Sequence, residues 1–296
     1  MPRRALPLLM LLVACTGGDK YATLADRVRE RVERVPGAVV GVYVKDLGDE
    51  TTFGFNADTV FHAASTMKVP VMIEYFRALE DGRIARDAAI PLENRFASIV
   101  DSSAYTLDPG EDSDSAMSAR TGQQVPVREL VERMITRSSN LATNAVIALV
   151  GAPRAQATAR TLGAATIVVR RGVEDDKAFQ QGLNNTTTAR DLGALLEAIV
   201  TDKAAAPEDT KEMLAILERQ EFNEEIPAGL PAGTRVAHKT GQISGVLHDA
   251  AIVFPPEGRA PFILVVLTRG VPDERVARAI IQDVARDTWD ALVGDR

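Results

Sequence analysis

The segment RVAHKTGQISGVLHDAAIVFPPEGRAPFILVVLTR, residues 235–269, decides the fold of this chain of 296 residues. It contains three runs with the composition of β-strands. The strands are expected at residues 235–242, 247–254 and 261–269.

Two more strands are expected near the N-terminus. Residues 38–44 are rich in β-branched side chains, and a Gly-Asp-Glu turn joins them to a second strand at 51–55, so the pair predicts an antiparallel hairpin. Amphipathic helices are expected before this hairpin, where apolar residues recur every four positions near 24–32, and from about 273 to 292. Because strands come from both ends of the chain, we expect one five-stranded antiparallel sheet.

Helical spacing dominates the block between the two strand regions. The expected helices lie near residues 65–82, 127–136, 140–150, 153–162, 188–201 and 208–219. The polar, acidic stretch 101–124 has little periodicity and is expected to be a surface loop. The predicted fold class is therefore α/β (α+β), a five-stranded antiparallel sheet flanked by helices, with an inserted all-helical subdomain. The α/β part would cover 22–64 and 220–295, and the helical part 65–219.

The composition argues against two classes of function. The formal net charge is −7, so the chain lacks the basic balance that nucleic-acid-binding proteins use. Three histidines and one cysteine are present, and they are too scattered to form a zinc site. We therefore expect neither a nucleic-acid partner nor a bound metal.

The N-terminus has the pattern of a secretory signal. Two arginines precede an apolar run, residues 5–14, which is too short to cross a bilayer but suits a signal peptide over 1–14. The end of this run, with Cys15, resembles the bacterial lipoprotein box. The resemblance implies that Cys15 is lipidated, that 15–21 is a short tether to a membrane, and that the protein belongs to the bacterial cell envelope, facing the periplasm or the exterior. The alternative is ordinary cleavage beside an incidental cysteine.

The first chemical motif is Ser65-Thr-Met-Lys68, at the start of an apolar helix. A serine and a lysine three residues apart on a helix share one face, and the helix N-terminus offers free N–H groups to an oxyanion. Lys68 could take the serine proton only if burial or a second cation lowered its pKa. The motif predicts a nucleophile with its base, and the alternative is an N-cap serine beside a solvent-facing lysine.

The second motif, Ser138-Ser139-Asn140, lies at the junction of two expected helices. A hydroxyl there could pass a proton to a leaving group, and the amide could hold a substrate carbonyl. Serine and asparagine also favour helix N-termini, so a purely capping motif is the alternative.

The third motif, Lys239-Thr240-Gly241, lies in the first strand of the quoted segment. Its lysine and threonine together can bind a substrate carboxylate. Its glycine lets a ligand approach the backbone, so that the N–H of Gln242 can point at an oxyanion. A strand that ends in a glycine turn is the alternative.

In this order, Ser-x-x-Lys, Ser-x-Asn and Lys-Thr-Gly resemble the active site of serine β-lactamases and penicillin-binding proteins. The spacing of the second and third motifs and the short tail after the third resemble class A β-lactamases rather than the larger penicillin-binding enzymes. The resemblance covers roughly residues 22–295. The first gap is longer than is usual in class A, and the stretch 101–124 accounts for the excess.

The resemblance implies a role for each motif residue. Ser65 would form an acyl-enzyme with Lys68 as base or relay, and Ser138 would pass a proton to the leaving nitrogen. The N–H groups of Ser65 and Gln242 would form the oxyanion hole. The substrate-binding residues implied are Asn140, Lys239, Thr240, Gly241 and Gln242. The resemblance also implies no metal or organic cofactor, a small β-lactam or a peptidoglycan-type peptide as substrate, and a monomer.

Two positions depart from the class A pattern. Ser139 stands where those enzymes usually carry an aspartate, at a position that mainly braces the fold. Those enzymes hydrolyse the acyl-enzyme with a glutamate that an asparagine follows four residues later. Glu174 falls near the expected place, but Ala178 stands where the asparagine should be. Glu174 is expected to be the general base that activates water, and the alternative is a solvated member of an acidic run.

Two histidines lie near the third motif. His248 and Asp249 are adjacent on a strand and point to opposite faces, so they cannot pair as the dyad of a Ser-His-Asp triad. His238 alternates away from Lys239 and is expected to be buried. Arg269 ends the last strand near the same rim, where a simple strand-end charge is favoured over a role in carboxylate binding.

Three functions are open to such a site. The first is a β-lactamase that forms and hydrolyses an acyl-enzyme on Ser65. The second is a penicillin-binding D-alanyl peptidase or an esterase-like serine hydrolase with slow deacylation. The third is an envelope protein that binds β-lactams and stays acylated. The presence of a working general base distinguishes the first from the others, since such a base contributes about 10²–10⁴-fold.

Overall fold

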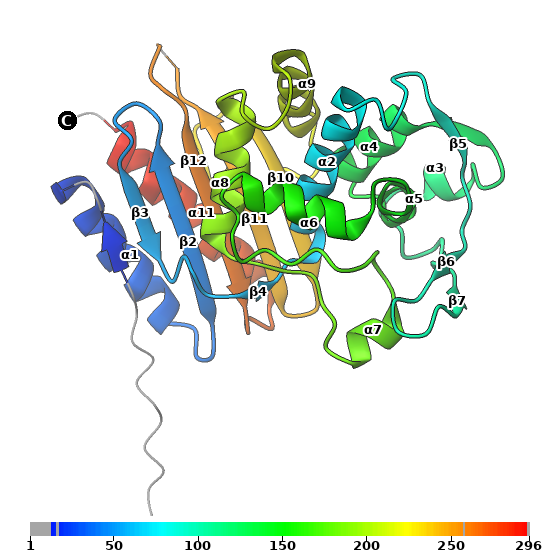
Figure 1. Cartoon of the computed structure of the whole chain (residues 1–296). Coiled ribbons are helices and arrows are strands. Elements are labelled where there is room, and N and C mark those ends of the chain that lie inside the picture. Colours follow the sequence, from blue (N-terminus) through cyan, green and yellow to red (C-terminus); the bar gives the residue numbers. More distant parts are fainter. Residues whose placement is uncertain (1–12, 16–17, 257, 295–296) are drawn as a thin grey trace, which may run out of the picture.

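The computed structural model describes residues 13–15, 18–256 and 258–294. An antiparallel sheet carries helices on both faces, and further helices gather beside it (Figure 1). The strand order is β1-β3-β2-β12-β11-β10. The strands are β1 (Val13–Cys15), β2 (Val39–Asp46), β3 (Thr52–Phe55), β10 (Arg235–Ile243), β11 (Val246–Phe254) and β12 (Phe262–Arg269).

The five expected strands are confirmed, and one short strand is added to them. β1 pairs antiparallel with β3, with Ala14 opposite Gly54. It lies in the segment that the sequence assigns to the signal peptide and the tether. The remaining strands of this sheet, β2, β3, β10, β11 and β12, therefore form the five-stranded sheet predicted for the processed chain.

The helices follow the predicted periodicity closely. They are α1 (Ala22–Glu33), α2 (Lys68–Glu80), α4 (Val127–Thr136), α5 (Asn140–Val150), α6 (Ala152–Thr161), α8 (Ala189–Val200), α9 (Pro207–Glu218) and α11 (Glu274–Leu292). Shorter helical turns are η1 (Gly18–Tyr21), η2 (Ala64–Met67), α3 (Ser115–Ser118), α7 (Asp176–Gln180) and α10 (Ile226–Gly229). Within the described residues, no helix has both the length and the apolar character needed to cross a membrane.

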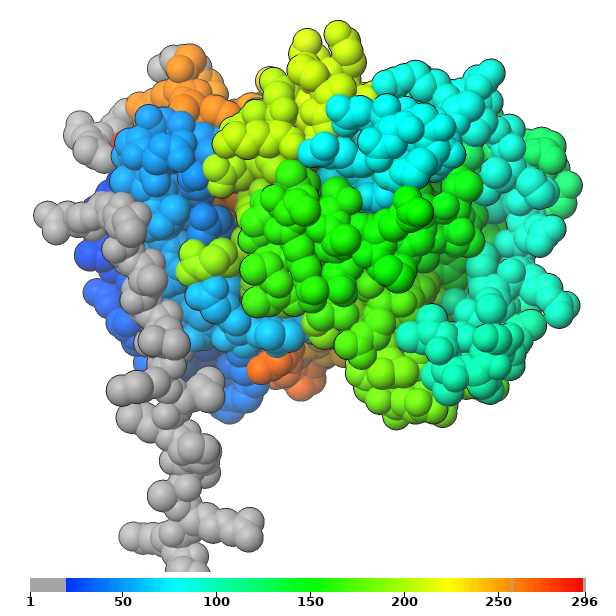
Figure 2. Space-filling view, in the orientation of Figure 1, coloured from blue at the N-terminus to red at the C-terminus, as the bar shows by residue number. Residues whose placement is uncertain are grey.

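Strand β12 is buried on both faces of the sheet. Leu264 and Val266 pack into a core with α1 and α11, and Ile263 and Val265 pack into a second core with α8 and the other helices. A strand covered on both sides needs apolar residues at every position, which explains why this part of the sequence does not alternate. In the space-filling view, the helical segments, cyan to green, lie directly against the sheet half (Figure 2).

Three two-stranded ladders lie outside the main sheet. They join β4 (Phe61–His62) to β9 (Thr186–Thr187), β5 (Ala89–Pro91) to β8 (Gln124–Pro126), and β6 (Phe96–Ala97) to β7 (Ala104–Tyr105).

The stretch 101–124, expected to be a surface loop, is in part a packed segment. It contains β7 and α3, and its Asp112, Asp114 and Met117 are buried. Asp114 forms an ion pair with Arg133 on α4 at 2.6 Å. The expectation was wrong because a polar composition does not exclude burial when each carboxylate finds a partner.

Candidate active site

Ser65 lies in a tight turn directly before helix α2. Thr66 donates two hydrogen bonds to the carbonyl of Ala63, from its N–H at 3.1 Å and from its hydroxyl at 2.6 Å. Ala64 has a φ of 45°, in the left-handed region that is costly for alanine. The helix expected from residue 65 therefore begins only at Lys68, and Ser65 stays half-buried on the preceding 3₁₀ turn.

Two buried lysines meet at the hydroxyl of Ser138. Lys68 donates to the Ser138 carbonyl at 2.7 Å, to Ser138 Oγ at 3.1 Å and to Asn140 Oδ1 at 3.0 Å. Lys239 donates to the same Ser138 Oγ at 3.1 Å. Both lysines are fully buried. The structure thus brings all three sequence motifs into one site.

The two lysines change each other's proton affinity. Burial lowers the pKa of Lys68 well below that of an ordinary lysine, and the charge of Lys239 lowers it further. Burial also lowers the pKa of Lys239 to about 7, while Asp249 and Glu225 act in the opposite direction. A neutral amine has a free lone pair. The lowered pKa makes the neutral form of Lys68 easier to reach than that of an ordinary lysine, which is the direction required of a base.

The second motif combines capping with chemistry. Ser139 is the N-cap of α5, and its hydroxyl accepts a hydrogen bond from the N–H of Ala142 at 3.2 Å. Ser138 precedes it with a φ of 55°, a conformation that few residues other than glycine adopt. A capping motif and a catalytic motif were the two alternatives for this segment. In the structure Ser139 caps the helix, whereas Ser138 and Asn140 contact Lys68.

Gly241 allows β10 to pack against the nucleophile turn. A Cβ atom at this position would lie 3.2 Å from the backbone nitrogens of Ser65 and Thr66 and 3.1 Å from Thr66 Cγ2. The backbone of the turn that carries Ser65 is thus in close contact with β10 at Gly241, the residue before Gln242.

Glu174 faces the second motif. Asn140 Nδ2 donates to Glu174 Oε1 at 2.7 Å, and burial raises the pKa of Glu174. The residue has a φ of 59°, so the loop makes a sharp turn where it presents this carboxylate. A carboxylate with a raised pKa is a stronger base than one in water. The alternative of a freely solvated glutamate does not agree with these contacts.

Contacts with the helical half position the loop that carries Glu174. Asn144 on α5 accepts a hydrogen bond from Val173 N at 2.7 Å and donates one to Val173 O at 3.0 Å. Asp175 accepts hydrogen bonds from Ser98 Oγ and from the N–H of Ile99, both at 2.9 Å. Ala178, at the position where the asparagine is expected, is buried and has no polar side-chain group with which to contact Glu174.

A cleft of about 370 Å³ opens in front of these groups. Its lining combines the three motifs with acidic and aromatic residues that the sequence did not single out. The lining residues are Ser65, Glu111, Ser113, Ser138, Asn140, Phe222, Glu224, Glu225, Thr240, Gly241, Gln242, Leu247 and Arg278. In the described residues, no group of three or more His, Cys, Asp or Glu side chains is arranged to hold a metal.

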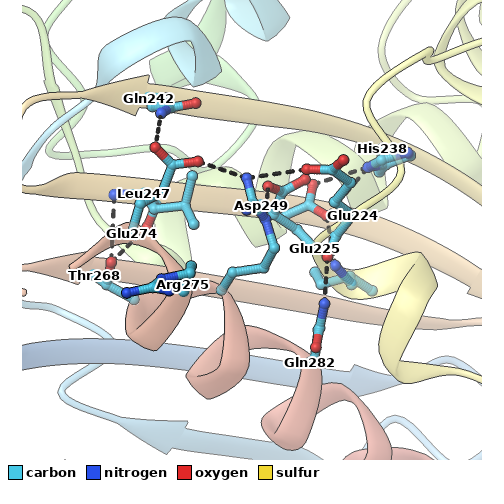
Figure 3. Close-up of polar contacts among 12 residues, drawn as sticks. Glu224, Glu225, His238, Gln242, Leu247, Asp249, Thr268, Glu274, Arg275 and Gln282 are labelled. Atoms are coloured by element: carbon cyan, nitrogen blue, oxygen red, sulfur yellow. Dashed lines mark hydrogen bonds and ion pairs between the residues drawn. The ribbon is translucent and has the colours of Figure 1, made fainter.

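A polar network lies on the other side of β10 from the lysines. His238 Nδ1 contacts Asp249 Oδ1 at 3.0 Å, and both side chains are buried (Figure 3). Gln242 donates from its amide to Glu274 at 2.6 Å (Figure 3). Arg278 forms ion pairs with Glu224 at 3.1 Å and with Glu274 at 2.6 Å.

The histidine and arginine expectations have different outcomes. His248 is buried against the carbonyl of His62, at 2.9 Å, and does not pair with Asp249, as expected. His238 is buried as expected, but its pairing with Asp249 was missed, because the partner lies across the β10–β11 ladder. Arg269 donates to the carbonyl of Val60 at 2.9 Å, so its side chain is bound outside the lining of the cleft.

The family described as "Beta-lactamase enzyme family" matches residues 23–292. Beta-lactamase AST-1 of Nocardia asteroides is 30% identical over 96% of this chain and 92% of its own length. The solved structure of PBP-A has a TM-score of 0.78 and 27% identity, covering 91% of this chain and 96% of its own. A mutant of PBP-A, solved as an acyl-enzyme complex with penicillin G, has a TM-score of 0.76 and 29% identity, covering 91% of this chain and 96% of its own.

Ser65 and Ser138 line one cleft, and Lys68 and Lys239 both donate to the hydroxyl of Ser138. The family match extends over nearly all of the described residues. The chain belongs to the β-lactamase enzyme family.

Proposed function

We propose that this protein is a serine hydrolase that opens the amide bond of β-lactams through an acyl-enzyme on Ser65. One observation carries the proposal: the hydroxyl of Ser138 accepts hydrogen bonds from two buried lysines in the cleft that contains Ser65. Such a hydroxyl can relay a proton between the nucleophile and a leaving nitrogen.

Acylation begins with the loss of the Ser65 proton to neutral Lys68. Ser65 Oγ then bonds to the β-lactam carbonyl carbon, and the N–H groups of Ser65 and Gln242 stabilise the oxyanion. As the carbon–nitrogen bond breaks, the proton passes from Lys68 through Ser138 to the nitrogen. Lys239 and Thr240 bind the substrate carboxylate, and Asn140 holds the side-chain amide.

Deacylation needs a water molecule and a base. Glu174 takes a proton from the water, whose oxygen bonds to the ester carbonyl carbon. The bond from that carbon to Ser65 Oγ then breaks, and Glu174 returns the proton so that Ser65 leaves as a hydroxyl. The contact between Glu174 and Asn140 at 2.7 Å and the raised pKa of Glu174 support this role. The product is the ring-opened acid.

The experiment combines turnover with the mass of the intact protein. We expect the wild type to hydrolyse a chromogenic cephalosporin and to carry no lasting adduct after a pulse of penicillin G. Glu174→Gln should accumulate the adduct, because loss of a general base slows deacylation about 10²–10⁴-fold. Ser65→Ala should form no adduct. Rapid turnover by Ser65→Ala would contradict the proposal.

A second candidate is a penicillin-binding enzyme with slow deacylation. It is favoured by the likeness to PBP-A and by Ala178, which leaves Glu174 without the usual asparagine partner. This candidate predicts a stable adduct on wild-type Ser65 and slow release. A D-alanyl peptide or a small ester would then be the substrate that turns over, and the same mass measurement separates the two candidates.

We also propose that the chain is exported and anchored in the cell envelope by lipidation of Cys15, and that it is a monomer. The apolar run before the only cysteine in the sequence supports the first part. In a bacterial host, Cys15→Ala should move the protein from the membrane fraction to the soluble exported fraction. An unchanged distribution would contradict lipid anchoring, and light scattering would test the monomer.

A further inference from the structure

The inserted stretch 101–124 reaches into the catalytic motif through Asp112. Its Oδ2 accepts a hydrogen bond from the N–H of Leu141 at 2.8 Å and one from the hydroxyl of Ser139 at 3.2 Å. Asp112 is 7% exposed, and Ser139 is fully buried. A carboxylate thus lies against the first turn of α5, although the motif itself holds a serine where class A enzymes usually carry an aspartate.

The residues that follow Asp112 contact α4 and the residue directly after it. Asp114, two residues on, forms its ion pair with Arg133 at 2.6 Å, and Ser113 Oγ donates to the carbonyl of Arg137 at 2.6 Å. The N–H of Asp114 donates to Asp112 Oδ1 at 2.9 Å. Both oxygens of Asp112 are therefore used, one within its own loop and one on the motif.

We infer that Asp112 is a positioning residue for the reaction: it supplies from the inserted stretch the carboxylate that the second motif lacks. This inference rests on the proposed function. The first N–H groups of a helix have no partner within the helix, and an anion at the helix N-terminus is stabilised by the helix dipole. Asp112 holds Ser139 and Leu141 in place. It thereby keeps Ser138, which precedes Ser139, and Asn140, which lies between the two, in contact with Lys68.

Asp112 also acts through its charge. The charged groups that face Lys68 are Lys239 on β10, Asp112 on the inserted stretch and Glu174 on its loop. Lys239 lowers the pKa of Lys68, whereas Asp112 and Glu174 raise it. Removing the charge of Asp112 would lower the pKa of Lys68 further. Because Lys68 acts as a base when neutral, the acid limb of the acylation rate should then move to lower pH.

The test moves the carboxylate from position 112 to position 139. We compare Asp112→Ala, Ser139→Asp and the double variant, with Asp112→Asn as a milder change should Asp112→Ala fold poorly. Asp114→Asn is the matched control, since Asp114 is a buried carboxylate of the same stretch that bonds to α4 and not to the motif. Two quantities are measured: the rate at which penicillin G acylates Ser65, from the intact mass, across pH, and the midpoint of thermal unfolding.

We expect Asp112→Ala to slow acylation about tenfold to a hundredfold, because a charge-assisted hydrogen bond and its geometry are lost. Ser139→Asp alone should also lower stability and rate, because it places a second buried carboxylate beside Asp112. The double variant should recover most of both, because an aspartate is a good N-cap. Asp114→Asn should lower the unfolding midpoint without changing the acylation rate or its pH profile.

Failure of this inference differs from failure of the proposed function. If the wild type acylates and the double variant is as slow as the worse single variant, the positioning role is wrong and the hydrolase proposal stands. An Asp112→Asn variant with the wild-type rate and pH profile would overturn the role in the same way. If the wild type neither hydrolyses the cephalosporin nor forms any adduct with penicillin G, the hydrolase proposal fails. The unfolding midpoints of the wild type, the two single variants and the double variant still decide whether the two carboxylate positions compensate each other.

Discussion

Replacing Gly241 by alanine tests how closely β10 must approach the nucleophile. The added Cβ would lie 3.1 Å from Thr66 Cγ2 and 3.2 Å from the nitrogens of Ser65 and Thr66. The φ of Gly241 is outside the left-handed region, so alanine meets no backbone penalty and the effect is steric. Two of the three neighbours are backbone atoms of the turn, which must move by a few tenths of an ångström.

The expected loss follows from what the turn does. Removal of one oxyanion-hole donor costs about 10²–10³ in kcat, and Gly241→Ala displaces such a donor without removing it. We therefore expect acylation to slow about tenfold to a hundredfold, while stability falls by about 1–3 kcal/mol, as for other small-to-large changes in packed sites.

Gly48→Ala is the control for this change. Its Cβ would lie 3.1 Å from Ala260 Cβ and 3.2 Å from Asp46 Oδ1, an equally tight contact in a turn that does not line the cleft. Stopped-flow acylation and urea unfolding are measured on both variants. If Gly241→Ala acylates at the wild-type rate, or if Gly48→Ala loses as much activity, the acylation rate does not depend on the position of the Ser65 N–H.

Two further substitutions test the deacylation step separately from acylation, and the effect of Asp249 on the protonation of Lys239. Asn144→Ala removes both hydrogen bonds to Val173 and should slow deacylation about tenfold, because Glu174 is then misplaced. Single-turnover mass measurements should show an unchanged acylation rate. An equal loss of rate in acylation and deacylation would contradict this prediction. Asp249→Asn should lower the pKa of Lys239 below about 7, because Asp249 raises it. Lys239 binds the substrate carboxylate when it is protonated. KM should therefore rise near neutral pH, and the basic limb of the pH profile of kcat/KM should move to lower pH. An unchanged basic limb would exclude this effect of Asp249 on Lys239.

The parts of the site found from sequence are those with a local pattern. Ser65 and Lys68 are three residues apart, and Lys239 lies in a strand with a recognisable composition. Each is defined by near neighbours in the chain, and the order and spacing of the three motifs together carry the resemblance that assigns their roles. The strands and helices were predictable for the same reason, since periodicity is a property of short windows.

The parts that were missed depend on contacts between distant segments. Asp112 touches Leu141, which is 29 residues away, and an aspartate in a polar loop gives no local signal. Two facts together could have pointed to it: the motif lacks an aspartate at 139, and an acidic insertion precedes it. His238 and Asp249 could have been found from the ladder, since Thr240 lies opposite Asp249 and His238 is then diagonal to Asp249 on the same face.

The buried lysines also predict how stability depends on pH. A lysine whose pKa is lowered in the folded state binds fewer protons there than in the unfolded chain, at any pH between the two pKa values. Stability then rises with pH, by about 1.4 kcal/mol per pH unit for one such group. Because burial and Lys239 hold the pKa of Lys68 well below its ordinary value, Lys68 should add to the rise of stability with pH at pH values between its folded pKa and the ordinary lysine pKa.

Lys68→Met tests this contribution, since a thioether cannot titrate. Urea unfolding of both proteins at several pH values should give a steeper rise for the wild type, while Ser65→Ala should keep the wild-type slope. Parallel curves for Lys68→Met and the wild type would mean that Lys68 stays protonated in the folded protein. Because a protonated amine cannot take the Ser65 proton, such curves would also remove Lys68 as the base, and the acylation step would need another acceptor.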